Sequence, residues 1–344
     1  MSSVTRISAA TRTDDPRRLA SLLQWTGWLP LAGLAVAYPL AAPVSDPVRY
    51  LPLLASAVVF GMPHGALDYV ALPRALDGGV TRRGLGIVGV LYAVLGVGYL
   101  ALWWLVPIVA ATVFILLTWF HWGQGELYVL RDVFGASYVD RTQQVLTTGV
   151  RGGLPMLVPL IAFPDRYSAV LETFVAPFGG AVGTWPLFEP NARVALAAAF
   201  GMLTIATLVR GRRRSGSSRA WRLDATEVVV LWVVFLLVEP ILAIGVYFCL
   251  WHSVRHLARV GWLDGRVRTA VEDGQWWRAI GRVGLEAAPL SIAALALIGG
   301  LFTLVPTGSS IGGAVGLYLV GIAVLTLPHT VVVTWIDRKQ GFWL

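Results

Sequence analysis

The sequence predicts an all-α, polytopic integral membrane protein, a single helical bundle of about ten transmembrane helices. Its composition is the first indication, because 56% of the residues are hydrophobic, 13% are charged and the mean hydropathy is +0.70. Soluble proteins carry about 25% charged residues. Apolar runs of about 18 residues or more recur along nearly the whole chain, and each can cross a hydrocarbon core of ~30 Å. We therefore expect residues 1–344 to form one transmembrane domain, without a separate globular domain.

The expected spans follow these apolar runs. In chain order they cover 20–42, 51–72, 85–105, 108–130, 145–163, 191–209, 225–238, 241–260, 286–305 and 311–335. The first run is longer than the apolar region of a signal peptide, so we expect an uncleaved helix. Residues 171–190 are too broken by Gly and Pro to span, and we expect a re-entrant segment or a surface loop there. Residues 266–282 mix Arg with Trp, which favours an interfacial amphipathic helix.

The positive charges are arranged to orient the chain in a membrane. The formal net charge is +8, but the basic residues lie in short loops between apolar runs, so we expect no nucleic-acid partner. With the N-terminus inside, the cytoplasmic segments include the tail 1–19 and the Arg-rich loop 210–224, while the outside loops carry only Arg49 and Arg166. This bias predicts a multi-pass protein of the cell (inner) membrane, surrounded by lipid, with both termini cytoplasmic.

All five histidines lie within or at the end of predicted spans. An imidazole in hydrocarbon is costly, so such residues face the protein interior and indicate function. Counted along their helices, His64, His121, His252 and His256 lie roughly 11 to 15 residues from the outer face, in one layer at a depth of about 20 Å. His252 and His256 also share a helix face. Four imidazoles at one level predict a mononuclear metal site, although helix–helix hydrogen bonding explains any single one of them equally well.

Three further ionisable residues belong to this predicted site. His329 lies about 18 residues into its span, nearer the inner surface, so we expect it beside the metal ligands as a hydrogen-bonded core residue. Asp68 and Glu126 follow the first two histidines by four and five residues, and both are candidates to orient an imidazole from behind. For Glu126 a position at the inner interface is an equal alternative, and Arg255 is expected to reach that surface. Ligand type alone allows Fe, Zn, Cu or Ni.

Aromatic side chains are concentrated beside the histidines. Such a cluster favours an apolar cavity for a long conjugated substrate. The candidate substrate-binding residues are Phe60, Tyr69, Trp119, Trp122, Phe248 and Trp251. For any one of them, ordinary packing in the membrane core or at its interface is the simpler interpretation.

Four motifs, GMPHGALDY, FHWGQGE, WHSVRH and PHTVV, occur in this order. Together they resemble the Brp/Blh family of membrane β-carotene 15,15′-dioxygenases, over the chain from about residue 50 to the end. The resemblance implies an Fe(II) enzyme that cleaves the central double bond of β-carotene with O2 to give two molecules of retinal. It also implies that His64, His121, His252 and His256 are the catalytic iron ligands, and that a retinal-binding rhodopsin is a candidate acceptor of the product. Glu126 stands where the family often has Asp.

Other classes of function remain open at this point. A bis-histidine haem protein would move electrons across the membrane and show a strong Soret band. A transporter with a histidine proton relay would place its histidines at several depths. Membrane di-iron desaturases and hydroxylases need more histidines, in HxxxH and HxxHH clusters, than the five in this chain.

The charge pattern yields a prediction about topology. Reporter fusions within residues 210–222 should report a cytoplasmic position, because the basic loops alternate so regularly with the uncharged ones. Fusions after Arg166, in a predicted outside loop, are the matched control and should report the opposite side. An extracellular signal from 210–222 would show that the number of spans is wrong.

Overall fold

The computed structural model describes residues 15–41, 44–183, 185–306 and 310–342, and every regular element within these ranges is helical. The first elements are α1 (Asp15–Leu40), α2 (Asp46–Ala55), α3 (Gly61–Ala66), α4 (Asp68–Asp77), α5 (Arg82–Leu105), α6 (Pro107–Tyr128), η1 (Val129–Val133), α7 (Arg141–Ala162) and α8 (Pro164–Val175). They are followed by η2 (Ala176–Phe178), η3 (Pro186–Phe188), α9 (Pro190–Ser215), α10 (Arg219–Leu237), α11 (Pro240–Val246), η4 (Tyr247–His252), α12 (Ser253–Gly261), α13 (Gly265–Glu272), α14 (Trp276–Leu304) and α15 (Ile311–Lys339). Of the η segments, η1 and η4 are π-helical.

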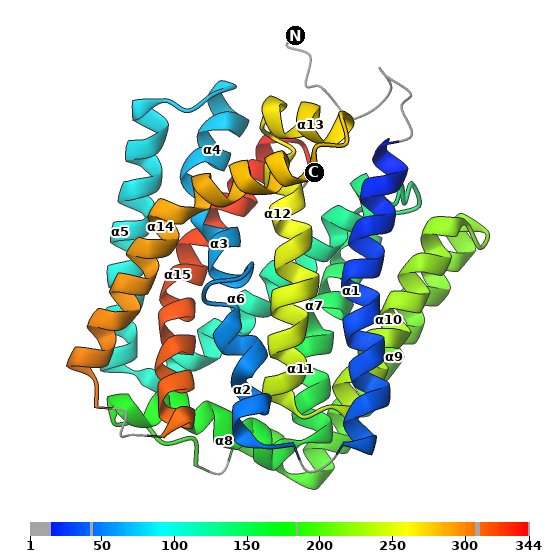
Figure 1. Ribbon diagram of the computed structural model, residues 1–344. Coiled ribbons are helices and arrows are strands. Elements are labelled where there is room, and N and C mark those ends of the chain that lie inside the picture. Colours follow the sequence, from blue (N-terminus) through cyan, green and yellow to red (C-terminus); the bar gives the residue numbers. More distant parts are fainter. Residues whose placement is uncertain (1–14, 42–43, 184, 307–309, 343–344) are drawn as a thin grey trace.

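The helices form a bundle in which most run between two ends (Figure 1). Within the described residues, eight helices are long and apolar enough to cross a membrane, which confirms the predicted class. They are Leu19–Leu40, Arg82–Leu105, Pro107–Val133, Arg141–Ala162, Pro190–Ser215, Pro240–Gly261, Trp276–Leu304 and Ile311–Lys339. The start of α1 and the end of α15 lie at the same end of the bundle (Figure 1).

The predicted span 51–72 is wrong as a single helix. The chain forms α2, then a turn, then the short helices α3 and α4. The break lies at Phe60, whose φ of 39° is a conformation that side chains rarely adopt. Gly61 follows it, where an added Cβ would lie 2.5 Å from the Ser56 carbonyl oxygen. Hydropathy reports composition and not backbone conformation, so the apolar run concealed this break.

Three other predictions are refined by the structure. Separate helices on either side of Glu239 and Pro240 are confirmed, because α10 ends at Leu237 and α11 begins at Pro240. The broken stretch 171–190 begins inside α8, which lies across one end of the bundle (Figure 1). The interfacial helix is shorter than 266–282, because α13 ends before Gly274, at φ 71°, and the tryptophans that follow belong to the long helix α14.

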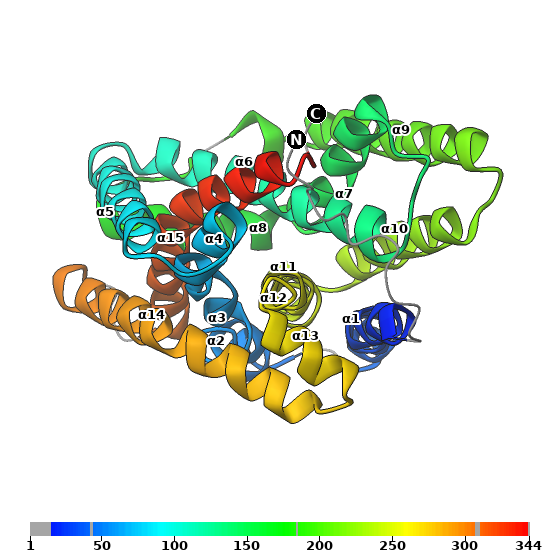
Figure 2. The ribbon, with the colours of Figure 1, turned by 90° about the horizontal axis from the view of Figure 1, so that it is seen from above.

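The segment α11–η4–α12 occupies the middle of the bundle. Figure 2 shows it end-on, with α1, α3, α7, α10 and α13 around it. Within the membrane-crossing helices, 67% of the span Pro240–Gly261 is buried, against 17% of α5 and of α9. Side chains from this segment are therefore screened from lipid. Polar groups at membrane depth need such an interior position.

A buried charge network joins this central segment to its neighbours. Arg151 of α7 contacts Glu126 at 2.9 Å, and Asp224 and Glu227 of α10 each at 2.8 Å. Arg255 of α12 contacts Glu126 at 2.6 Å and Glu227 at 2.5 Å. All five residues are at most 3% exposed. The expectation that Arg255 reaches the inner surface is therefore wrong, because the carboxylates of α6 and α10 hold its guanidinium inside the bundle.

This network predicts an asymmetry between two arginine substitutions. Arg151→Met should destabilise the fold by about 3–5 kcal/mol, because three buried carboxylates lose a shared partner. Arg210→Met removes a half-exposed pair with Asp140 and should cost about 1 kcal/mol or less. The midpoint of thermal unfolding in detergent measures both. Equal midpoints for the two variants would contradict a structural role for the buried network.

Candidate metal centre

The five histidines of this chain lie around one point. They come from five elements: His64 from α3, His121 from α6, His252 from η4, His256 from α12 and His329 from α15. Each is at most 7% exposed. The distances between their ring centroids, for nine of the ten pairs, lie between 4.6 and 6.5 Å. Helices far apart in the sequence thus bring all the imidazoles of the protein into contact.

These distances suit several ligands of a single metal ion. With metal–nitrogen bonds of about 2.1 Å, imidazole centroids lie about 3.3 Å from the metal, so two ligand rings are about 4.6 Å apart at a right angle and about 6.5 Å apart when opposite. The observed range covers the same interval. His121 and His252 also direct their Nε2 atoms at each other, 3.2 Å apart. With such bonds, two neighbouring ligand atoms are about 3.0 Å apart in an octahedral site and about 3.4 Å apart in a tetrahedral site. The observed separation lies between these two values.

Several polar atoms of the cluster have no hydrogen-bond partner among the described residues. These atoms are Nδ1 of His121, Nε2 of His256 and Nε2 of His329. Burying a polar atom unpaired costs free energy, and natural proteins rarely do so. Among the described residues, His64, His121 and His329 can each offer one ligand atom within 4.8 Å of the other two, and Asp68, His256 and His329 form a second such group. The residues present therefore fit a metal ion that is held first by a set of three, with His329 common to both sets.

The local backbone positions His64. The break before α3 makes Gly61 the first residue of this helix. Nδ1 of His64 contacts the carbonyl oxygen of Gly61, three residues earlier in the same turn. Ser253 of α12 contacts the same nitrogen at 3.3 Å. With Nδ1 occupied in this way, Nε2 of His64 is the atom left to face the other histidines. The unusual φ of Phe60 thus lies directly before the helix that carries His64 into the cluster.

His329 does not lie deeper than the other four histidines, as residue counting predicted. Its ring centroid is 4.6 Å from that of His121 and 5.0 Å from those of His64 and His256. Counting assumes that each helix is perpendicular to the membrane, but Figure 2 shows α14 and α15 lengthwise where α1 and α11 are seen end-on. An inclined helix rises less per residue along the membrane normal, so more residues are needed to reach the same level.

Asp68 holds His329 rather than His64. Its Oδ2 accepts a hydrogen bond from Nδ1 of His329 at 2.8 Å and another from the Tyr92 hydroxyl at 2.7 Å. A carboxylate behind the outer nitrogen of an imidazole is the usual support of a metal-binding histidine. Asp68 thus has the predicted orienting role, but for a different histidine, because the break between α3 and α4 removes the helical relation to His64.

Glu126 acts on the cluster through arginines. Its Oε2 accepts hydrogen bonds from Arg151 and Arg255, so the alternative of a residue at the inner interface is wrong. It borders a small cavity together with His252, His256 and Arg255. Arg255 also packs over the ring of Trp251, 4.0 Å from its centroid. The charge network therefore forms the wall behind the two histidines of the central segment.

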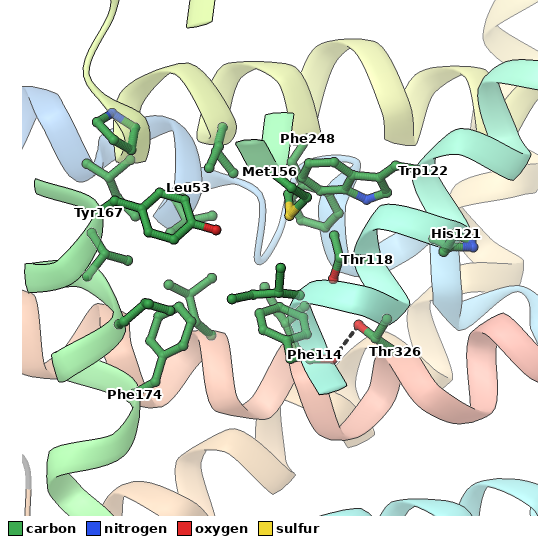
Figure 3. A pocket seen from close by; sticks show the side chains of 18 of the residues that line it. Leu53, Phe114, Thr118, His121, Trp122, Met156, Tyr167, Phe174, Phe248 and Thr326 are labelled. Atoms are coloured by element: carbon green, nitrogen blue, oxygen red, sulfur yellow. Dashed lines mark hydrogen bonds between the residues drawn. The ribbon is translucent and has the colours of Figure 1, made fainter. Parts of the chain in front are cut away.

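An apolar cavity, cavity A, extends from the histidines toward α8, which lies across one end of the bundle. Figure 3 shows side chains from several helices converging on it. Its wall includes Leu53, Phe114, Met156, Tyr167 and Phe174. All five are buried, and the empty space in and around the cavity, open space included, is about 900 Å³. The apolar lining suits a hydrophobic ligand.

A second cavity, cavity B, meets cavity A at the histidines. Five residues line both cavities, namely His64, Phe248, Ile322, Thr326 and His329. Cavity B extends from there between α5, α14 and α15, and the empty space in and around it, open space included, is about 1100 Å³. The histidine cluster is therefore at the junction of two apolar arms, which gives a long molecule room on either side of it.

The predicted aromatic set lines these cavities only in part. Trp122 lines cavity A and Phe248 lines both cavities, as expected. The other four predicted residues, Phe60, Tyr69, Trp119 and Trp251, are not among the lining residues. Tyr69 and Trp119 instead donate hydrogen bonds to backbone carbonyl oxygens of other helices, and Trp251 packs beneath Arg255. Nearness in sequence to a histidine does not predict which residues line a cavity, because successive residues of a helix face different directions.

Sequence reasoning missed Phe114, Met156, Tyr167 and Phe174. The first two belong to α6 and α7, and the others to α8, which the sequence did not predict as a helix. A usable signal was present in α8, because Tyr167, Leu171 and Phe174 follow the spacing of one helix face.

Comparisons with known proteins agree with the four-motif resemblance. A family model described as beta-carotene 15,15′-dioxygenase matches residues 55–337. A Halobacterium salinarum protein described as probable beta-carotene 15,15′-dioxygenase Blh is 51% identical over 327 residues, which cover 94% of this chain and 95% of the relative. Another protein of that organism, described as probable beta-carotene 15,15′-dioxygenase Brp, is 27% identical over 327 residues, or 91% of this chain and 90% of the relative. No solved structure matches the chain.

The support of His329 yields a prediction about metal affinity. Asp68→Asn should weaken Fe(II) binding 10- to 100-fold, because the imidazole loses the carboxylate that fixes its orientation and basicity. Tyr92→Phe is the matched control, since it removes only the outer hydrogen bond to Asp68 and should have a smaller effect. Competition with a chelator measures the affinity of the detergent-purified protein. Unchanged binding in Asp68→Asn would exclude a role for this carboxylate at a metal ligand.

Proposed function

Because the chain belongs to the family of beta-carotene 15,15′-dioxygenases, we propose that it cleaves the central double bond of β-carotene with O2 to give two molecules of retinal. The observation that carries this proposal is the position of the histidine cluster at the junction of two apolar cavities. A symmetric polyene that fills both arms has its centre beside the imidazoles and an end in each cavity. The reaction breaks the central C=C bond and the O–O bond and forms two C=O bonds, so no further reductant is needed.

We assign the metal as Fe(II), held by the histidine cluster. His64, His121, His252 and His256 are the proposed ligands, as the family resemblance implies. His329 is proposed as an additional ligand, because Asp68 occupies its Nδ1 and its Nε2 has no partner among the described residues. When bound, Fe(II) supplies the redox chemistry that lets O2 react with a carbon–carbon double bond.

The protein's own residues position the substrate and exclude water. The walls of both arms are almost entirely apolar, so burial of the polyene drives binding, at about 25 cal/mol per Å² of apolar surface. Phe248 lies edge-on to His64, with centroids 5.5 Å apart, and Trp122 lies 5.6 Å from His252. These two rings border the junction and would hold the central part of the polyene. Among the described residues, no Asp, Glu, Lys or Arg side chain lines either arm.

The topology completes the proposal. We propose ten crossings, in which α2–α4 and α10 cross the cell membrane beside the eight apolar helices. The segment α10 is 19 residues long and contains most of the predicted span 225–238, but Arg222, Asp224 and Glu227 near its start keep it outside the eight most apolar helices. Both carboxylates are buried against Arg151, so they need not face lipid. Both termini are then cytoplasmic, on the side of the basic loops.

The clustering of the histidines weighs against the alternatives. A proton relay needs imidazoles at successive depths, whereas these five rings surround one point. A haem sandwiched by two histidines needs a flat space between facing rings, and here His121 and His252 approach to 3.2 Å. Both observations favour a single ion over a relay or a porphyrin.

Purified in detergent and supplied with Fe(II), the protein should convert β-carotene to retinal. The visible absorption of the carotenoid should decay while a near-ultraviolet band grows, and chromatography should identify one product. Removing O2 should stop the reaction, because O2 is a reactant of the proposed step. Adding a chelator should also stop it, because the chelator removes the iron cofactor.

Zn(II) serves as the control metal for this reaction. It should bind the same imidazoles without supporting turnover, because it has no redox chemistry. Cleavage that persists without iron or without O2 would contradict the proposed function. A strong Soret band in the purified protein would favour the haem alternative.

A further inference from the structure

Cavity A and cavity B differ in one respect: only cavity B has exposed residues in its wall. All residues that line cavity A are buried or half-buried. In the wall of cavity B, Val97 of α5 is 68% exposed and Leu297 of α14 is 38% exposed, and Ala293 beside it is also exposed. Cavity B therefore has a mouth on the side of the bundle, between α5 and α14.

The mouth is framed by packed apolar clusters above and below it. Toward the inner end, Val88 of α5 and Ala287 of α14 belong to one cluster with residues of α4. Toward the outer end, Leu301 of α14 packs in another cluster with Leu100 of α5. Over its whole length α14 packs mainly against α3, α13 and α15. Figure 1 shows α14 crossing α15 obliquely toward the outer end of α5.

The mouth lies within the length of two helices that are apolar enough to cross a membrane, so we place it in the hydrocarbon layer. Val97 is eight residues before the end of α5 at Leu105, and Leu297 is seven residues before the end of α14 at Leu304. At 1.5 Å per residue, both lie about 10–12 Å from the outer end of their helices along the helix axis, which is a smaller depth for the inclined helix α14. Exposed side chains at this depth face lipid tails, which matches the apolar character of the rim.

The opposite route, from the outer surface into cavity A, leads past an ion pair. Cavity A borders a polar pocket that shares Pro240 and Ile241 with it. In that pocket Arg49 contacts Glu239 at 2.5 Å, and Glu239 is 3% exposed. An apolar molecule forms no favourable interaction with this ion pair. Separating the two charged groups to let it pass would cost free energy, because each would be left buried without its partner.

We propose that cavity B is a lateral portal, through which one end of an apolar carotenoid enters from the membrane between α5 and α14 and passes the histidine cluster into cavity A. The proposal rests on the proposed function for the identity of the ligand. Cavity A is then the closed end of the path, and Val97, Ala293 and Leu297 form the rim that admits the substrate. The competing occupant of the same mouth is a lipid acyl chain.

A bulky side chain at the rim tests the portal. Ala293→Trp should lower kcat/KM for β-carotene in liposomes by roughly tenfold or more, mainly through KM, while kcat and iron content stay near wild type. Ile292→Trp is the matched control, because Ile292 is the preceding residue of α14, is 66% exposed and does not line the cavity. It should leave kcat/KM unchanged. Equal loss in both variants would overturn the portal.

Chemical modification of a cysteine at the rim distinguishes entry of the substrate from its cleavage. In a Cys249→Ser background, which removes the only native cysteine, Ala293→Cys is modified with a bulky hydrophobic maleimide. Modification before anaerobic exposure to β-carotene should prevent loading, which is read from the visible absorption that remains with the protein. Modification after loading should retain the carotenoid and leave a single turnover on addition of O2 intact. Ile292→Cys, treated in the same way, should load normally in both orders.

The loading measurement keeps the two proposals distinguishable. Loading that is blocked at position 293 without any cleavage in the unmodified protein would support the portal and contradict the proposed function. Cleavage in the unmodified protein together with normal loading after modification would overturn the portal and leave the reaction standing. In that case a lipid chain is the occupant of the mouth.

Discussion

Ionisable side chains buried at membrane depth must find their partners inside the protein, and this constraint organises the whole structure. The five imidazoles face one another, and the charged residues behind them form a closed network of two arginines and three carboxylates. Both groups meet at the central segment α11–η4–α12, which carries His252, Arg255 and His256. The outer helices then need only apolar surfaces toward lipid, which is what α5, α9 and α14 present.

The irregular parts of the fold lie where this polar interior is assembled. The break at Phe60 directs His64 into the bundle, and the π-helical segment η4 contains Phe248, Trp251 and His252. Such π-helical turns often mark functional sites, because they change which side chains share a helix face. Small residues allow the close approach of the neighbouring helices. At Gly123 an added Cβ would lie 2.1 Å from the Thr148 carbonyl oxygen of α7.

Composition and motif order were sufficient for the class of protein and for its family, because both depend on features that are local in sequence. The selection of His64, His121, His252 and His256 from helix depth also agrees with their proximity in the structure. Other features depend on tertiary geometry. The inclination of α15 brought His329 to the same point, and no residue count contains that angle. One of the two arginine partners of Glu126 is Arg151, which lies on a different helix and has no motif to mark it.

The residues that line the cavities are the hardest feature to predict from the sequence, because they come from distant parts of the chain. Tyr167 and Phe174 reach cavity A from α8, more than a hundred residues from His329 along the chain, and only the packing of the bundle brings them together. The aromatic residues beside the histidines gave a reasonable prediction for Trp122 and Phe248. They failed for Trp251, which is fully buried beneath Arg255 on the far side of its helix.

The central claim is that all five histidines surround one iron ion. X-ray absorption at the iron edge tests it most directly, comparing the Fe(II)-loaded protein with its His329→Ala variant. We expect nitrogen neighbours near 2.1 Å with the outer-shell pattern of several imidazoles, and one imidazole fewer in the variant. A porphyrin pattern, or an identical imidazole shell in the two proteins, would contradict the five-histidine centre.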